Sequence, residues 1–291
     1  MTELPCISAW RRLSLKGLQS AGIEQARQSL LEAQRRLGPV VMRHTLLTMV
    51  AQACCEHVAG MCVRAEVPGL ELKLMTSRSG TDESRILFDL WEVAHDQMTI
   101  AEFLSEHGYH GPNGGCLESY VCRDEPAAVE DLARQYRGLL PEAHPKHAAR
   151  QRIESAEDAR RRLLRAIPSV RRPFASALLR LATEMPALRE LGKSTFLQIV
   201  DVGRAAARTI GTVLTDQGAL ADMSDVFFLT VSEACEVREA DLRALIERRR
   251  SDDSYFRTRQ HAHAISLAPR GVLSALLFHR MLKALIPNTL R

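Results

Sequence analysis

The run Arg189-Glu190-Leu191-Gly192-Lys193 is the strongest candidate for chemistry in this sequence. Arg189 and Lys193 are four positions apart, so on a helix both side chains project from one face. An arginine fork and a mobile ammonium suit a transferring phosphoryl group, and Glu190 could orient either cation or accept a proton. The alternative interpretation is an ordinary pair of charged side chains on a helix surface.

A glycine-rich segment, residues 103–126, is the second candidate. It is the one long irregular stretch in a chain that otherwise predicts helix after helix, and long irregular segments inside compact domains are usually functional. Tyr109, His110 and Arg123 are its candidates for contact with a substrate. Because a histidine can exchange a proton near neutral pH, His110 is also a candidate general base. The alternative is that its histidines are ordinary loop residues.

Two further patterns do not meet the requirements of the sites that they suggest. His107, His110, Cys116 and Cys122 have the side chains of zinc ligands, but their spacing fits no compact zinc motif. The run from Gly192 to Thr195 resembles the end of a phosphate-binding loop, but Ala187 stands where the first glycine is required and no strand precedes it. We therefore predict neither a metal site nor a nucleotide site, and no cofactor bound by this chain.

Three stretches resemble the phosphoenolpyruvate synthase and rifampicin phosphotransferase-like family of PEP-utilising enzymes. The first is Gly108-Tyr109-His110-Gly111-Pro112 followed by Arg123-Asp124-Glu125-Pro126. The second runs through residues 188–198 and the third through residues 225–230, in the order that the family shows. The resemblance covers roughly residues 25–260 and corresponds to the helical substrate-binding region in the middle of a much longer enzyme. Asn113, Gly114 and Cys122 depart from the family's pattern.

The resemblance implies a function in ligand binding. In the family, a kinase-like ATP-grasp domain phosphorylates a mobile histidine domain, which then passes the phosphoryl group to a ligand held by the helical region. The ligand implied here is rifamycin-like or otherwise hydroxylated. The substrate-binding residues implied are Arg189, Glu190, Lys193, Tyr109, His110 and Arg123, of which Arg189, Lys193 and His110 are also the candidates for catalysis.

The same resemblance implies partners. ATP and Mg²⁺ are implied only for an ATP-grasp domain and a phosphohistidine domain, which could be separate chains, so we do not expect this chain alone to transfer phosphate. His261 and His263 faintly resemble the family's phosphorylated histidine run, which we treat as coincidence. The alternative function is a non-catalytic structural or interaction protein, or a degenerate remnant of such an enzyme.

Composition predicts an all-α protein. Leu, Ala, Arg and Glu dominate, aromatic residues make up only 5%, and the first group are good helix formers. We expect an irregular bundle of about nine helices in two halves, with a long glycine-rich loop at the rim of an apolar cleft between them. The predicted divisions are residues 1–140 with the loop at 107–126, residues 141–262, and a divergent amphipathic tail at 263–291. Prolines 141 and 145 forbid a continuous helix at the first boundary.

Several helix ends are predicted from local signals. Gly38-Pro39 is expected to end one helix and Met185-Pro186 another, because proline breaks the hydrogen-bond ladder. Capping boxes are expected at Thr99 and Thr230. Residues 1–19 contain no motif. The final confident helix is expected over about residues 238–260.

Charge and cysteine usage limit the environment and the partners. The net charge is +4, and the arginine-rich stretch 150–180 lacks interleaved aromatics, so a solvated face is expected there in preference to a nucleic-acid site. Seven cysteines, an odd number, follow no disulfide framework and predict reduced thiols in the cytoplasm. No membrane span is expected, because Arg43, His44 and further polar residues interrupt the most apolar helix.

Overall fold

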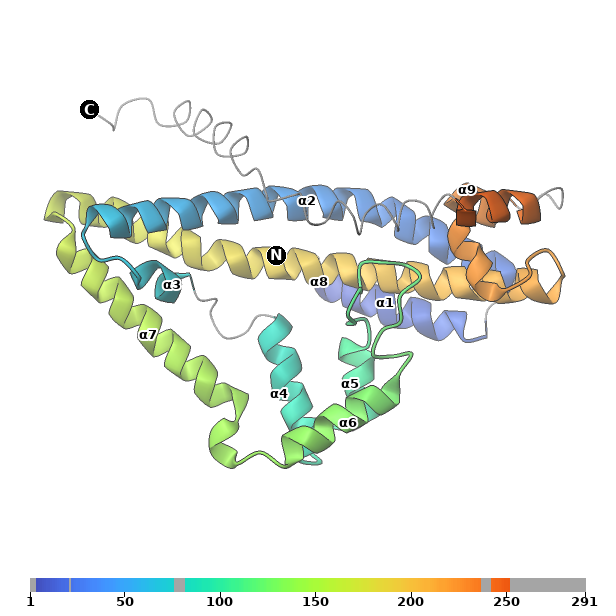
Figure 1. Cartoon of the computed structure of the whole chain (residues 1–291), viewed down its shortest axis with the longest axis horizontal. Helices are drawn as coiled ribbons and strands as arrows, with labels where there is room; N and C mark the ends of the chain where they lie inside the picture. Colours follow the sequence, from blue (N-terminus) through green and yellow to red (C-terminus); the bar gives the residue numbers. More distant parts are fainter. Residues whose placement is uncertain (1–3, 21, 76–81, 237–241, 252–291) are drawn as a thin grey trace, which may run out of the picture.

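Two long antiparallel helices form the frame of the protein. The computed structural model describes residues 4–20, 22–75, 82–236 and 242–251. Helix α2 (Ile23–Arg64) lies along helix α8 (Arg172–Asp216) over most of its length, and α1 (Leu4–Leu18) packs against α8 from another side (Figure 1). The pair keeps one register, because Gly203 contacts Ala33 and Gly192 contacts His44.

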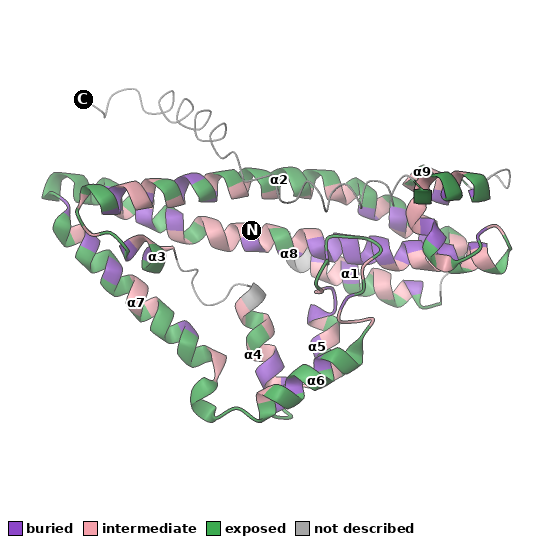
Figure 2. Ribbon diagram, in the orientation of Figure 1, coloured by how far each residue is buried: buried purple, intermediate pink, exposed green. Residues whose placement is uncertain are grey.

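Apolar residues of α2 and α8 make two separate cores, one at each end of the pair. At one end Leu30 of α2 packs with Ala206 and Ile210 of α8, and at the other Val58 packs with Leu179. Along most of α2, buried residues alternate with exposed ones (Figure 2), which is the pattern expected of an amphipathic helix. In α8, residues 197–204 are all buried, because α1 and residues 108–125 pack against this stretch in addition to α2.

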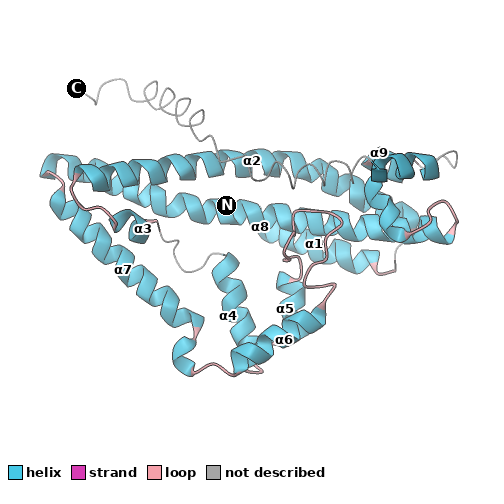
Figure 3. Cartoon of the chain, viewed as in Figure 1, coloured by secondary structure: helices cyan, strands magenta, loops and turns pink. Residues whose placement is uncertain are grey.

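The remaining elements are also helical, and the described residues contain no strand, so the predicted all-α class is confirmed (Figure 3). Helices α4, α5 and α6 lie off one side of the long pair, and α7 runs back to the start of α8. The elements are α3 (Leu70–Leu74), α4 (Asp82–Ala94), α5 (Ile100–His107), α6 (Pro126–Arg137), η1 (Pro141–Ala143), α7 (Pro145–Ala166), η2 (Ser169–Arg171), η3 (Met223–Phe228) and α9 (Val231–Cys235). Residues 242–251 form a further helical stretch.

Two predicted helix ends are wrong, because Pro39 lies inside α2 and Pro186 lies inside α8. An interior proline removes one hydrogen bond and crowds the preceding turn. Tertiary packing overrides this cost, since Leu37 and Val40 beside Pro39 pack against Ile199 of α8. The two prolines lie at different levels of the pair, so each faces an unbroken stretch of the other helix.

The two predicted capping boxes are confirmed. Thr99 and Thr230 both form capping boxes, with Glu102 and Glu233 as their reciprocal partners. The predicted lead of residues 1–19 is instead occupied by α1. The tail at 263–291, with His263, and the final part of the last predicted helix lie outside the described residues.

The predicted boundary near residues 140–150 coincides with η1 and the start of α7. The longest interface, between α2 and α8, joins one predicted half to the other. The division into halves stays a prediction.

One helix, α2, is long and apolar enough to cross a membrane by length and composition. The mean hydropathy of its most apolar 18-residue window is 1.4, and 28% of that window is buried. The sequence interpretation had discounted this helix because of its polar residues. The signal is weak evidence for a span, since core helices of soluble proteins show it too and α2 packs along α8.

Replacing the interior proline of α8 should stabilise the protein. Pro186→Ala restores a backbone N–H donor and relieves crowding, so the free energy of unfolding should rise by about 1–3 kcal/mol. Alanine also gives the unfolded chain more conformational freedom, which offsets up to about 1 kcal/mol of this gain. Pro173→Ala is the matched control, because Pro173 lies in the first turn of the same helix, where no hydrogen bond is lost. Urea denaturation measures both. Equal effects of the two substitutions would contradict the explanation.

Candidate ligand-binding site

A fully buried carboxylate, that of Asp201, lies in the middle of α8. Its Oδ2 accepts hydrogen bonds from Arg11 Nε and Arg123 Nη1, both at 2.7 Å, and Arg204 Nη1 lies 3.3 Å from Oδ1. Three guanidinium groups from α1, the segment after α5 and α8 itself therefore converge on one carboxylate. Ion pairs of this kind hold only when nearly every polar atom finds a partner.

Arg204 connects this cluster to residues 108–125, which link α5 to α6. The side chain of Arg204 is fully buried, and its Nη2 donates to the backbone oxygens of Gly114 at 2.7 Å and Cys116 at 2.9 Å. One turn further along α8, Arg208 pairs with Asp124 at 2.7 Å and donates to the Ser119 oxygen. The two arginines hold the middle and the C-terminal part of the irregular segment against α8.

Burial lowers the pKa of Arg204, and the adjacent Asp201 carboxylate opposes this shift. A guanidinium nevertheless keeps its proton near neutral pH, so Arg204 acts as a permanent donor. The charged form is stabilised by Asp201 and by the two backbone oxygens that it binds. The segment is thus held by a group that does not change its charge in the physiological range.

The backbone of the 108–125 segment folds closely on itself. A Cβ at Gly111 would lie 2.7 Å from the Tyr120 oxygen, so only glycine fits there. Tyr109 is buried, and its hydroxyl shares a 2.8 Å hydrogen bond with Ser194 of α8. Arg11 lies over the same aromatic ring, 4.9 Å from its centre. Tyr109 therefore fastens the segment to α8.

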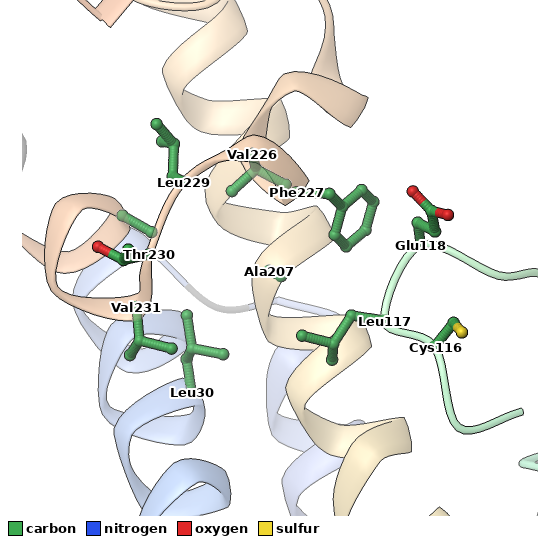
Figure 4. Close-up of a pocket in the computed structure, with 11 residues that line it drawn as sticks. Leu30, Cys116, Leu117, Glu118, Ala207, Val226, Phe227, Leu229, Thr230 and Val231 are labelled. Atoms are coloured by element: carbon green, nitrogen blue, oxygen red, sulfur yellow. The ribbon is translucent and has the colours of Figure 1, made fainter. Parts of the chain in front are cut away.

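Beyond this fastened segment lies a pocket of about 210 Å³. Figure 4 shows its walls, which come from α2, α8, the 108–125 segment, η3 and α9. The lining residues are Leu30, Cys116, Leu117, Glu118, Ala207, Val226, Phe227, Leu229, Thr230, Val231 and Ala234. Most of them are apolar, while Glu118, Thr230 and Cys116 supply the polar groups. Such a lining suits an apolar ligand portion that carries a few hydroxyl groups.

Ion pairs stabilise the wall formed by η3 and α9. Glu233 caps α9 and accepts hydrogen bonds from Arg249 Nη1 at 2.7 Å and Nη2 at 3.0 Å. The pKa of Glu233 is lowered to about 2, mainly by its hydrogen bonds with Arg249 and next by the hydrogen bond from the Thr230 backbone N–H. Arg250 pairs with the buried Asp225 of η3. Helical residues 242–251 thus brace this side of the pocket.

The predicted phosphoryl-binding residues lie elsewhere on α8. Glu190 is buried and pairs with Arg189. Lys193 Nζ lies 3.8 Å from Oε2 of Glu190. His44 of α2 approaches the same turn, with Nδ1 3.2 Å from the Arg189 oxygen. The distance along α8 from Ala207, which lines the pocket, to residues 189–193 is about 20–27 Å, given the 1.5 Å rise per residue. The two places cannot contact the same part of a small ligand.

The other predicted residues lie between these places. Tyr109 is hydrogen-bonded to Ser194, and Arg123 is hydrogen-bonded to Asp201. His110 is half-buried, and its ring lies 4.1 Å from that of Tyr109 and 6.2 Å from that of His107, centre to centre. The proposed catalytic and substrate-binding roles of all six residues stay predictions.

The metal alternative finds no support in the described part of the chain. His107 pairs with Asp89 at 2.6 Å, and no group of three or more His, Cys, Asp and Glu side chains is placed to hold an ion within the described residues.

Asp201 and Arg204 were missed by the sequence interpretation. A signal was present, because both stand inside the otherwise apolar run from Ile199 to Ala207. Charged residues in such a run are seldom buried unless they are paired. Residues 225–230, which include pocket residues of η3, stood out only by their family resemblance, because their apolar pattern is that of an ordinary connector.

Comparison with known families gives a match to the central part of the chain. Residues 80–190 match the sequence model of the rifampicin phosphotransferase fourth domain. The central region is rifampicin phosphotransferase-like. A search of curated proteins finds no match to the chain. The rifampicin phosphotransferase-like region begins before α4 and ends in the first half of α8, so it contains the whole 108–125 segment but only the first residues of the Arg189 run.

Removing the central carboxylate should destabilise the whole protein. Asp201→Ala leaves three guanidinium groups without their shared partner, and breaking a buried pair costs about 3–5 kcal/mol. Asp131→Ala removes an exposed carboxylate that pairs with Arg134 and should cost less than about 1 kcal/mol. Chemical denaturation of both variants measures the difference. A loss below 1 kcal/mol for Asp201→Ala would show that the cluster is not the main constraint on the fold.

Stability should depend on the charge of Glu233 at acidic pH. Its folded-state pKa of about 2 is below the ordinary value of 4.5, so its contribution is complete above about pH 5 and is lost as the pH falls toward 2. Glu233→Gln should lower the melting temperature at pH 6, and this difference from the wild type should shrink steadily between pH 5 and pH 2. A difference that does not change over this range would contradict the assignment.

Proposed function

We propose that this chain is a ligand-binding helical domain of a rifampicin phosphotransferase-like system. One observation supports the proposal above the others, namely an apolar pocket with one wall, formed by Cys116, Leu117 and Glu118, in the region similar to a rifampicin phosphotransferase domain. Phe227, Leu117 and Leu30 offer apolar surface, and Glu118 and Thr230 can meet hydroxyl groups. The ligand class is an apolar molecule with several hydroxyls, such as a rifamycin-type macrocycle.

The size of the pocket defines how such a ligand would bind. Sites that enclose a drug-sized ligand have volumes of about 300–1,000 Å³, and this pocket is smaller. We therefore propose that it takes one apolar portion of a larger molecule, whose remaining atoms lie over the rim near Glu118 and Thr230. The acceptor hydroxyl would then face outward, where a separate phosphoryl donor could approach it.

We further propose that other domains or chains handle ATP and Mg²⁺. The donor would be a phosphohistidine domain, and Arg189 and Lys193 are the residues proposed to meet it, since each is about half exposed and both flank the Glu190 carboxylate. Because they lie about 20–27 Å from the pocket along α8, we propose that they contact the donor domain and not the bound ligand portion. In this arrangement the chain binds and presents the ligand without itself carrying out the transfer.

Isothermal titration calorimetry of the chain with a rifamycin-type macrocycle tests the binding proposal. Val231→Trp should fill the pocket and weaken binding at least tenfold, because Val231 lines it and is only half-buried. Val170→Trp, at an 83% exposed position outside the pocket, is the matched control and should leave binding unchanged. ATP with Mg²⁺ should give no binding heat.

Two outcomes would redirect the proposal. Loss of binding in Arg189→Ala or His110→Ala, with Val231→Trp unaffected, would move the ligand to the site predicted from sequence. If no macrocycle gives binding heat although the chain melts cooperatively, the binding proposal is wrong. A structural or interaction protein is then the favoured function.

A further inference from the structure

The side of α2 that faces away from α8 carries a continuous exposed stripe. Apart from the neighbours Thr45 and Leu46, its members follow one another at steps of three or four residues, so they lie along one face of the helix. We call this stripe the outer face; it comprises Arg35, Gly38, Met42, Thr45, Leu46, Met49, Gln52 and Glu56, all exposed. In Figure 2 this stretch of α2 appears as exposed along its upper side.

The middle of the outer face is apolar and its ends are charged. Met42 is 63% exposed and Leu46 is 55% exposed, and Val41 extends the apolar area beside them. Between Arg36 and Glu56 the only residue of fixed charge is Arg43. A contiguous apolar stripe with a polar border marks an interaction surface more often than scattered exposed residues do.

The order of residues along the outer face is complementary to itself when reversed. Arg35 and Glu56 lie at equal distances, about 16 Å, on either side of the point between Thr45 and Leu46. Met42 and Met49 are likewise equidistant from that point. A second copy of α2, laid antiparallel across a two-fold axis there, would place Arg35 opposite Glu56 twice and Met42 opposite Met49 twice.

We propose that the outer face of α2 is the self-association surface of this protein, pairing antiparallel with the same face of a second copy. Leu46 lies next to the two-fold axis and packs against its own counterpart. The Arg35 side chain is 77% exposed and shares its intramolecular partner, Glu32, with Arg36, so it can turn to a carboxylate of the second copy. The pairs at the two ends fix the antiparallel direction and the register.

A second copy of the chain and the chain's own residues 252–291 are the two candidates to cover the outer face, and their charges distinguish them. Residues 252–291 contain six Lys and Arg residues and two Asp residues, which gives a net charge of +4. As a whole, that segment would be repelled by Arg35 and Arg43 and attracted by Glu56. A second copy pairs the charge at both ends, which favours it on electrostatic complementarity.

The expected association is weak. A single pair of helices over about 22 residues is about 32 Å long and belongs to the small class of interfaces, below about 1,200 Å² in total. The dimer should therefore form in a concentration-dependent manner.

Sedimentation equilibrium of the full chain with charge-reversal variants tests the proposal. Arg35→Glu and Glu56→Arg each turn two attractive pairs into two repulsive ones, so each should weaken the dimer roughly tenfold. An equimolar mixture of the two variants should form a heterodimer close to wild-type strength, because both of its pairs are again attractive. The double variant Arg35→Glu/Glu56→Arg should likewise recover.

Controls separate this result from misfolding and from general charge effects. Arg150→Glu and Glu154→Arg reverse an exposed ion pair on α7, away from the outer face, and should leave association unchanged. Leu46→Glu should abolish the dimer while the helical circular dichroism signal is retained.

Three results would overturn the proposal. They are a wild-type chain that stays monomeric at the highest soluble concentration, a dimer that does not respond to the charge reversals, and a chain that dimerises only after residues 252–291 are removed. The last result would assign the outer face to that segment. Binding of anionic vesicles by a monomeric wild type but not by Leu46→Glu would assign it to a membrane surface.

Discussion

The Asp201 carboxylate is the interaction on which most of the structure depends. A carboxylate with no exposed surface must be paired, and here its partners come from three places in the sequence. Arg11 ties α1 to α8, and also donates to the Ser105 oxygen of α5. Arg123 and Arg204 tie the 108–125 segment to the same point. One buried charge therefore determines where three chain segments meet.

The long antiparallel pair of α2 and α8 provides the surface on which this cluster is built. Its length requires both helices to pass through an interior proline, which neither would do well in isolation. Packing along the shared face compensates, and the staggered positions of Pro39 and Pro186 keep the two weak points apart. The inner faces form the two cores, and the charge cluster lies where α8 meets α1 and the 108–125 segment. The outer face of α2 remains exposed, with an apolar middle.

The pocket and the predicted chemical residues have separate places on one scaffold. Arg189, Glu190 and Lys193 lie near His44, whereas the pocket lies further along α8, beside η3 and α9. Tyr109 and Arg123, which sequence reasoning assigned to substrate contact, hold the segment in place. In the function that we propose, one region of α8 would bind the ligand and another would meet the donor of the phosphoryl group.

The sequence by itself determined the helical class, the capping boxes at Thr99 and Thr230, and the relation of the central region to rifampicin phosphotransferase, because each depends on local patterns. Only the tertiary structure decided that Pro39 and Pro186 do not end their helices and that Asp201 and Arg204 are the buried centre. The same holds for the pocket, whose walls come from residues as distant as Leu30 and Ala234. Packing energy and the pairing of buried charges act between segments far apart in the chain, so no local pattern can specify them.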